Sequence, residues 1–289
     1  MLIEQPLGKQ FPYDVVIVVS PHPDDSCIAV GGLLYRLSHE RPSCQVHVLV
    51  MTSGYRGVTD QYLKRYLDAR AEASIASEGE EVRHGLQLLS RKPSEPLSPQ
   101  ERQQLVDLKT KIREEEVAEE SRVLSFTPHY LRLNIYEEHA ITEQDQARFI
   151  QVLDVLHTQG QNRLLIHPGI YDAHQTHRLC SQLARDVLDL RYPKLYERWT
   201  YESPWTQFHV RSDIIVPLSE SAFSAKVLAT NAHRSQTERT PYGNLVEGIA
   251  VRNAAVMSEI LGSFNVNHAY PLGRYVELLA RQNDRIVFV

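Results

Sequence analysis

The sequence predicts an α/β protein with a Rossmann-like, mostly parallel sheet flanked by helices and a C-terminal α/β extension. A short run of β-branched apolar residues at 15–19 has the composition of a strand that is buried on both faces, and residues 45–51 predict a second buried strand. Between them, apolar residues at helical spacing predict a single crossover helix, so the three segments form a βαβ unit. The same alternation returns later in the chain, which is typical of a doubly wound sheet.

The middle of the chain continues this pattern after a long helical segment. Residues 61–124 are polar and rich in helix formers, and a proline series at 93–99 predicts a loop between two helices. Residues 130–134 predict a third strand and residues 163–166 a fourth, with a helix between them.

The last third of the chain is predicted to extend the same fold. Residues 196–216 have the pattern of two short strands, and residues 218–233 and 246–261 have the pattern of helices. We therefore expect a single domain over residues 1–289, made of a Rossmann-like core at 1–190 and an extension at 191–289 packed on it.

Composition excludes several classes of protein. A chain of 289 residues with 42% hydrophobic and 23% charged residues suits one large globular domain. The net charge of -5 argues against a nucleic-acid-binding surface. No apolar run reaches the ~18–20 residues that cross a bilayer, and the first residues lack a signal-peptide core, so we expect a cytoplasmic protein without a membrane partner.

The stretch VVSPHPDDSCIAVGG places His22, Asp24 and Asp25 directly after the first predicted strand. Two explanations fit this arrangement. The aspartates would cap free amides at the start of the following helix. Alternatively, His and Asp side chains at the exit of a strand would bind a divalent metal. The motif alone favours neither.

A second polar cluster, HPGIYDAHQTHRL, follows the fourth predicted strand. His174 and His177 are three residues apart, so a helix that begins just before them presents both on one face, although such a pair also occurs as ordinary surface polarity. Because the carboxyl ends of parallel strands meet at one edge of a sheet, His22, Asp25 and His177 would form a metal site with an open position for water. Asp24, next to these ligands, would take the proton of that water.

The two clusters together resemble a known family. PHPDDS and HPGIYDAHQTHR are similar to the signatures of the PIG-L/LmbE-like zinc-dependent de-N-acetylases, and MTSGYRGVTD, IREEE and KVLATNAHRSQ resemble further family segments in the same order. The forms GYRGVTD and HRSQ are most similar to the diacetylchitobiose deacetylase-like branch. The resemblance implies a hydrolase that removes an N-acetyl group from an N-acetylglucosamine-containing small molecule or disaccharide and releases acetate. The implied cofactor is Zn²⁺ or another divalent metal.

The roles of the family carry over residue by residue. Protonated His174 would act on the developing oxyanion or the leaving amine, whereas Arg113 and Glu137 would equally serve as salt-bridge partners at helix ends. The implied set is the metal ligands His22, Asp25 and His177, the general base Asp24 with His174 as second catalytic residue, and the substrate-binding residues Arg56, Arg113 and Glu137.

The sequence also departs from the family. Ser26 stands where the family often has Glu, so a carboxylate beside the ligands is expected to be missing there. Thr176 stands where an Asp often precedes the second histidine of the pair. The segment 61–110 is longer than expected, and we assign His233 of the HRSQ signature to packing at a helix end rather than to substrate contact.

Two other functions remain open on the sequence. One is an amidohydrolase that cleaves a different acyl group, and the other is a non-catalytic sugar- or metal-binding protein on the same fold. Asp24 and His174, both present beside the three ligands, argue against the second. The resemblance implies a small amino-sugar substrate and a homo-oligomer, either a trimer or a hexamer.

Overall fold

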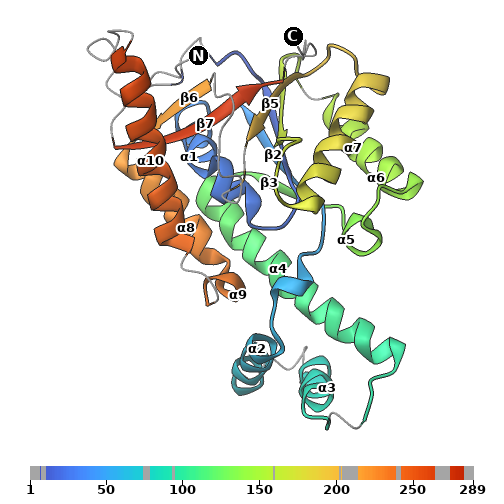
Figure 1. The fold of residues 1–289 in the computed structure, drawn as a ribbon. Coiled ribbons are helices and arrows are strands. Elements are labelled where there is room, and N and C mark those ends of the chain that lie inside the picture. Colours follow the sequence, from blue (N-terminus) through green and yellow to red (C-terminus); the bar gives the residue numbers. More distant parts are fainter. Residues whose placement is uncertain are drawn as a thin grey trace.

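One seven-stranded sheet organises the molecule (Figure 1). The computed structural model describes residues 7, 11–73, 79–92, 95–158, 160–201, 203, 214–238, 242–263 and 274–282. The strands are β1 (Val15–Ser20), β2 (Gln45–Val50), β3 (Thr127–Tyr130), β4 (Arg163–Pro168), β5 (Glu197–Tyr201), β6 (Ile214–Leu218) and β7 (Tyr275–Arg281). Their order in the sheet is β3-β2-β1-β4-β5-β7-β6, which confirms the predicted α/β fold class.

The order of the strands creates a switch point beside β1. β1 pairs in parallel with β2 on one side and with β4 on the other, and β3 and β5 continue the parallel sheet outward. In open α/β sheets, ligands bind at the carboxyl ends of the strands where the order reverses in this way. The two polar clusters of the sequence follow β1 and β4, so both lie at this switch point.

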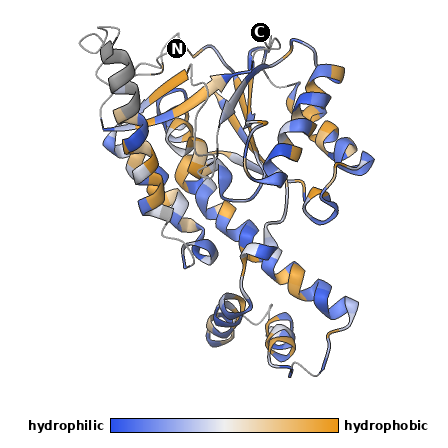
Figure 2. Ribbon diagram, in the orientation of Figure 1, coloured by the Kyte–Doolittle hydropathy of each residue, from blue (hydrophilic) through white to orange (hydrophobic). Residues whose placement is uncertain are grey.

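Helices cover both faces of the sheet because side chains alternate along β1. Val16 and Val18 face a core shared with α1 (Asp25–Glu40) and α8 (Glu220–Ala232), whereas Ile17 faces a core on the opposite side. Figure 2 shows mainly apolar strands flanked by helices in which apolar and polar residues alternate. The remaining helices of the main body are α5 (Ile135–Glu138), α6 (Glu143–Leu156), α7 (Gln175–Arg191), α9 (Arg234–Thr237) and α10 (Tyr242–Ser263).

The third strand lies three residues earlier than the sequence predicts. β3 ends at Tyr130, and Arg132 adopts a left-handed backbone with a φ of 45° that strand geometry does not allow. The amides of Leu131 and Leu133 still donate to Val50 and Met51 at 2.9 and 2.7 Å, and both leucines are buried. The apolar alternation of this segment therefore comes from core packing beyond the end of the strand.

The C-terminal extension continues the sheet. The two strands predicted within residues 196–216 correspond to β5 and β6, and residues 204–213 of this prediction lie outside the described residues. β7, which the sequence analysis did not predict, pairs antiparallel with both and lies between them. The division into a core at 1–190 and an extension at 191–289 within one domain stays a prediction.

The long segment predicted as helical contains α2 (Asp60–Glu72), α3 (Gly79–Leu89) and α4 (Pro99–Leu124), and η1 (Tyr55–Gly57) comes just before it. α2, α3 and the first half of α4 project from the body of the protein and pack on one another through a small apolar cluster of their own, whereas Val117 and Leu124 of α4 belong to the main core (Figure 1). α4 begins in a capping box between Ser98 and Glu101, directly after the predicted proline-rich loop.

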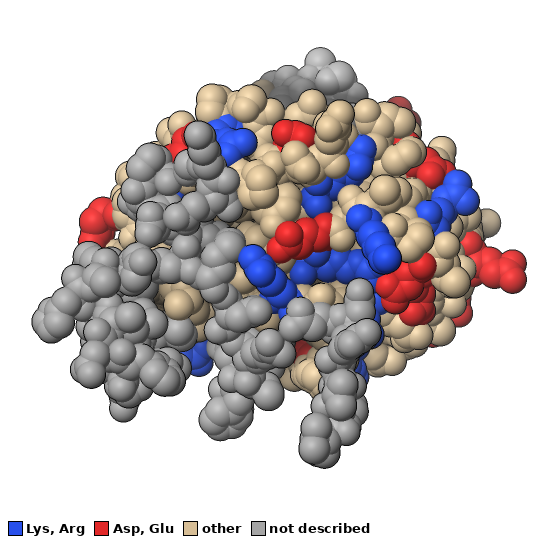
Figure 3. All heavy atoms as spheres, turned by 90° about the horizontal axis from the view of Figure 1, so that it is seen from above, with Lys and Arg blue, Asp and Glu red and all other residues tan. Residues whose placement is uncertain are grey.

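The described surface carries positive and negative side chains side by side. In the view from above Figure 1, Lys and Arg side chains are interspersed with Asp and Glu rather than gathered into one large basic area (Figure 3). Among the helices of the described ranges, none combines the length and the apolar character that a bilayer span needs.

Candidate active site

The turn after β1 brings His22 and Asp25 together. Asp25 Oδ2 accepts a hydrogen bond from the backbone N–H of His22 at 2.8 Å and lies 3.1 Å from its Nδ1. Asp24 is the N-cap residue of α1, yet its side chain caps none of the described amides. Its carboxylate lies 3.2 Å from the guanidinium of Arg113 instead. The explanation of Asp24 as a helix cap is therefore wrong.

His177 completes a triangle of ligand-type atoms. It lies in the first turn of α7, and its Nε2 is 3.2 Å from His22 Nδ1 and 3.1 Å from Asp25 Oδ2. Tetrahedral zinc with bonds of about 2.0–2.2 Å separates its ligand atoms by about 3.3–3.6 Å. The three side chains, here called the triad, would need to part by only a few tenths of an ångström to hold such an ion. The structure thus brings together all three residues that the sequence predicts as metal ligands.

The electrostatics of the triad favour positive charge at its centre. Burial alone would lower the pKa of His177, but the carboxylates of Asp25 and Asp172 outweigh burial and raise the pKa to about 10. Burial raises the pKa of Asp25, yet His177 and His22 hold it well below its ordinary value. A proton on His177 and a divalent cation would compete for the same position, because a metal ligand must be deprotonated.

Asp172 supports the triad, and the sequence analysis did not assign it a role. Its Oδ2 accepts from Nδ1 of His177 at 3.0 Å, and its Oδ1 accepts from the backbone N–H of His174 at 2.8 Å. A carboxylate in this position fixes the tautomer of a metal-binding histidine and directs Nε2 toward the metal. The only sequence signal was an Asp shortly before the histidine pair.

His174 lies at the exposed end of the site. It is the N-cap residue of α7, and its ring centroid is 4.7 Å from that of His22 and 5.0 Å from that of His177. Burial and these two histidines lower the pKa of His174 to about 4. The carboxylates of Asp25 and Asp172 act in the opposite direction on this pKa but are outweighed. The structure favours the neutral imidazole at pH 7, and the role of protonated His174 stays a prediction.

Two of the predicted substrate-binding residues pair at the mouth of the site. Arg56 Nη2 lies 2.8 Å from Glu137 Oε2, and both side chains are 45% exposed. The guanidinium is 5.0 Å from the ring of Tyr136, whose edge-to-face contact with His22 spans 5.7 Å. Tyr136 thus links this pair to the triad. An exposed donor, an exposed acceptor and an aromatic face are suited to the hydroxyls and ring of a sugar.

Arg113, the third residue predicted to bind substrate, is buried. It is 1% exposed, and its guanidinium lies between Asp24 at 3.2 Å and Glu116 at 2.6 Å. The neighbouring loop covers it, since a Cβ on Gly54 would come within 3.3 Å of its Nε. Substrate contact by Arg113 stays a prediction, and the contacts that the structure describes are with protein carboxylates.

A buried carboxylate, that of Glu120, contacts Ser26, the residue after the predicted ligand Asp25. Ser26 Oγ donates to Glu120 Oε1 at 2.7 Å, and Glu120 reaches this position from α4. His233, from the end of α8, donates to the other oxygen of Glu120 at 2.9 Å. Cys27 joins Glu120 and His233 in a fully buried group of ligand-type atoms. Residue 26 itself supplies no carboxylate, as expected, and the carboxylate that contacts it comes from a residue distant in the sequence.

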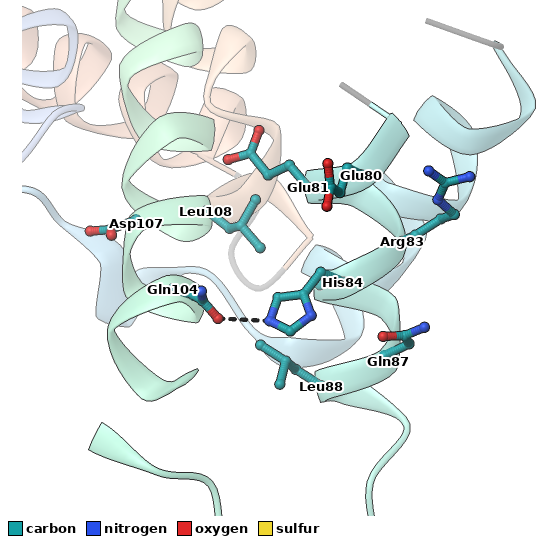
Figure 4. Close-up of a pocket in the computed structure, with 10 residues that line it drawn as sticks. Glu80, Glu81, Arg83, His84, Gln87, Leu88, Gln104, Asp107 and Leu108 are labelled. Atoms are coloured by element: carbon teal, nitrogen blue, oxygen red, sulfur yellow. Dashed lines mark hydrogen bonds between the residues drawn. The ribbon is translucent and has the colours of Figure 1, made fainter. Parts of the chain in front are cut away.

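A sizeable cavity of about 720 Å³ lies away from the triad, between α3 and α4 (Figure 4). His84 faces Gln104 across it with a hydrogen bond of 2.8 Å, and Glu80, Glu81 and Asp107 add carboxylates to its wall. None of its described lining residues belongs to the predicted site. The ligand geometry therefore locates the candidate active site better than cavity size does.

Comparison with known proteins identifies the family. The family model described as "PIG-L: GlcNAc-PI de-N-acetylase" matches residues 17–188, a range that contains every predicted site residue. This chain belongs to the PIG-L family. The family prediction made from PHPDDS and HPGIYDAHQTHR is confirmed.

One curated relative matches the PIG-L chain over most of its length. A protein of Bacteroides thetaiotaomicron named "Putative glucosamine-6-phosphate deaminase-like protein" is 26% identical in an alignment of 257 residues that covers 81% of this chain. The chain spans only 37% of the length of that relative.

Several solved structures share the fold. N,N'-diacetylchitobiose deacetylase from Pyrococcus horikoshii, of the branch that the sequence resembles, is 18% identical with a TM-score of 0.60 and covers 97% of this chain and 86% of its own. The conserved protein TT1542 from Thermus thermophilus is 18% identical with a TM-score of 0.57 and coverages of 95% and 96%. GalB from Pseudomonas putida, a 4-carboxy-2-hydroxymuconate hydratase, is 15% identical with a TM-score of 0.60 and coverages of 94% and 98%. At these identities the likeness concerns the fold, which hosts more than one reaction.

Proposed function

We propose that this PIG-L protein is a metal-dependent hydrolase that removes the N-acetyl group from an N-acetylglucosamine-containing small molecule or disaccharide. The observation that carries the proposal is the triad, whose His22, Asp25 and His177 atoms converge at 3.1–3.2 Å beside the buried carboxylate of Asp24. Zn²⁺ or another divalent cation held there would supply Lewis-acid chemistry, polarising an amide carbonyl and making water acidic enough to react near neutral pH.

The chain's own residues would carry the proton and hold the substrate. Asp24 has one oxygen engaged by Arg113, which leaves the other to accept a proton from the attacking water. Neutral His174, exposed beside the triad, is suited to hydrogen bonding with the acetamide or the departing amine. Arg56 would donate to hydroxyls of the sugar and Glu137 would accept from them, with Tyr136 as the apolar wall.

The proposal is tested by the acid that the protein releases. Purified, zinc-loaded protein would be incubated with N-acetylglucosamine, with diacetylchitobiose, and with N-butyryl analogues of both. We expect acetate from at least one acetylated sugar, and loss of about 10²–10⁴-fold of the rate in Asp24→Asn, the range that general bases contribute.

Other outcomes would contradict the proposal in distinct ways. Release of butyrate without acetate would favour an amidohydrolase of another acyl group. Zinc bound to the protein with neither acid released from any sugar would favour a binding protein on the same fold. The homo-oligomer and the cytoplasmic location stay predictions that these assays do not address.

A further inference from the structure

A chain of alternating charges runs behind the triad and returns to it. The chain of charges begins at Asp24, the residue before Asp25. It ends at Glu120, which contacts Ser26, the residue after Asp25. We propose that this charge chain holds the carboxylate of Asp24 in the position needed for proton transfer. The inference rests on the proposed hydrolase function and adds positioning residues to it. The members of the charge chain, in order, are Asp24, Arg113, Glu116, His233 and Glu120.

The first half of the charge chain fixes Arg113 on two carboxylates. Its Nη2 is 3.2 Å from Asp24 Oδ1, and its Nη1 donates to Glu116 Oε2 at 2.6 Å. Glu116 is itself held by Ser235, which donates its backbone N–H at 2.6 Å and its hydroxyl at 3.0 Å. The planar guanidinium of Arg113 can rotate only if its hydrogen bond to Glu116 breaks. The carboxylate of Asp24 therefore has a partner in a fixed orientation.

The second half returns the charge chain to the turn. His233 donates from Nε2 to Glu120 at 2.9 Å, and its Nδ1 faces Glu116 at 3.8 Å. Burial alone would lower the pKa of His233, but Cys27 and the two glutamates outweigh burial and raise it well above its ordinary value. The imidazole is thus a cation between two carboxylates. Glu120 then accepts from the hydroxyl of Ser26 at 2.7 Å.

Burial makes this arrangement stiff. Each of the five side chains belongs to a residue that is less than 9% exposed, and Arg113, His233 and Glu120 are at most 1% exposed. In such an environment a charge is tolerated only beside its opposite, and removal of one member leaves its neighbours uncompensated. The alternation of three anions and two cations permits one arrangement, which preorganises Asp24 before substrate binds.

The charge chain also links the C-terminal extension to the site. Arg113, Glu116 and Glu120 lie at positions i, i+3 and i+7 of α4 and so share one face. His233 and Ser235 come from the junction of α8 and α9, in the extension. Three segments distant in the sequence therefore meet behind Asp24, and this gives the HRSQ signature a role beyond packing at a helix end.

The central test separates positioning from substrate binding. In zinc-loaded protein, Glu116→Gln should reduce kcat about 10–100-fold with KM within twofold of wild type, since a small displacement of a reacting group has effects of this size. Glu119→Gln is the matched control, because Glu119 also ties α4 to α9, through Arg234 at 3.0 Å, but lies outside the charge chain. We expect its kcat to equal that of wild type.

Arg113→Lys supplies a second test that does not depend on the folding of Glu116→Gln. A lysine ammonium keeps the charge but lacks the planar fork that bridges two carboxylates. We expect kcat to fall and KM to stay within twofold. A raised KM with unchanged kcat would overturn the inference and make Arg113 a substrate-binding residue. An equal loss of kcat in Glu119→Gln would also overturn it.

A measurement without substrate keeps this inference distinct from the proposed function. Thermal unfolding of Asp24→Asn, Glu116→Gln and the double variant forms a double-mutant cycle across Arg113. Because one guanidinium bridges both carboxylates, the Tm shift of the double variant should differ from the sum of the single shifts by about 2 °C or more. Additive shifts would refute the bridge. Absence of acetate release by wild type together with a non-additive cycle would contradict the proposed function and leave the bridge through Arg113 in place.

Discussion

Asp172→Asn provides a sharp test of how the triad is held. In the wild type one carboxylate accepts two hydrogen bonds, from His177 Nδ1 at 3.0 Å and from the backbone N–H of His174 at 2.8 Å. An asparagine has a single oxygen, so in either orientation its NH₂ group faces one of these two donors. If it faces His177, the ring must carry its proton on Nε2, which is the nitrogen that would bind the metal.

The expected magnitude follows from this geometry. The loss of one hydrogen bond to a charged acceptor costs about 1.5–3 kcal/mol. Replacing a carboxylate that orients a metal-binding histidine weakens metal affinity by about 10–100-fold, which is about 1.4–2.7 kcal/mol. The two estimates agree, so we expect the Kd for zinc to rise by about one to two orders of magnitude.

Competition with a chromogenic chelator at fixed pH would measure the affinity. Asp154→Asn is the control, because Asp154 also accepts hydrogen bonds from neighbouring side chains, Tyr192 at 2.5 Å and Arg191 at 2.8 Å, but on the exposed surface. Wild-type zinc affinity in folded Asp172→Asn would refute the reasoning. An equal weakening in Asp154→Asn would refute it as well.

Three further predictions concern stability and pH. Glu277→Ala should lower the free energy of unfolding by about 3–5 kcal/mol in urea titrations, because Glu277 forms an ion pair with buried Lys226. Glu277 also accepts hydrogen bonds from the backbone amides of Gly32 and Leu33, which a kink in α1 leaves without their helical partners. A loss no larger than that in the control Glu247→Ala, at an exposed glutamate, would contradict this prediction. Because folding raises the pKa of His233, protonated His233 stabilises the fold fully below about pH 6.5, and this stabilisation is lost at higher pH by up to about 1.4 kcal/mol per pH unit. The free energy of unfolding of wild type should therefore fall relative to that of His233→Gln between pH 6.5 and 9. If the free energies of unfolding of the two proteins change in parallel with pH, His233 is not a buried imidazolium. The apparent affinity for zinc should rise with pH between 6 and 9, because His177 must lose a proton when the metal binds. A Kd for zinc that does not change with pH would contradict competition between the proton and the metal.

The sequence predicts the parallel core and the ligands well because their signals are local. A run of apolar residues such as 15–19 indicates a buried strand without any knowledge of which helices cover it. His22 and Asp25 lie within one short turn, so their proximity also follows from the local sequence. His177 could be joined to them because parallel strands bring their carboxyl ends to one edge. These predictions needed periodicity and topology, but not the contacts of individual side chains.

The contacts that support the ligands could not be predicted from local patterns, because they join segments that are distant in the sequence. Glu120 brings a carboxylate to Ser26 from a position 94 residues further along the chain. Arg113 matches a family motif, yet its burial depends on the loop at Gly54 and on Glu116. β7 was missed because residues 277–281, ELLAR, are mostly helix formers, and its pairing with β5 and β6 makes it a strand. Three-dimensional packing, rather than local composition, decides each of these.

The measurement that tests the central claim most directly is a titration of metal-free protein with zinc, followed by acetate release from N-acetylglucosamine or diacetylchitobiose. The triad predicts that the rate rises in proportion to added zinc and levels off at one equivalent per chain, and that His177→Ala abolishes both the rise and tight binding. Full activity in chelator-treated protein, or undiminished activation of His177→Ala by zinc, would contradict the account.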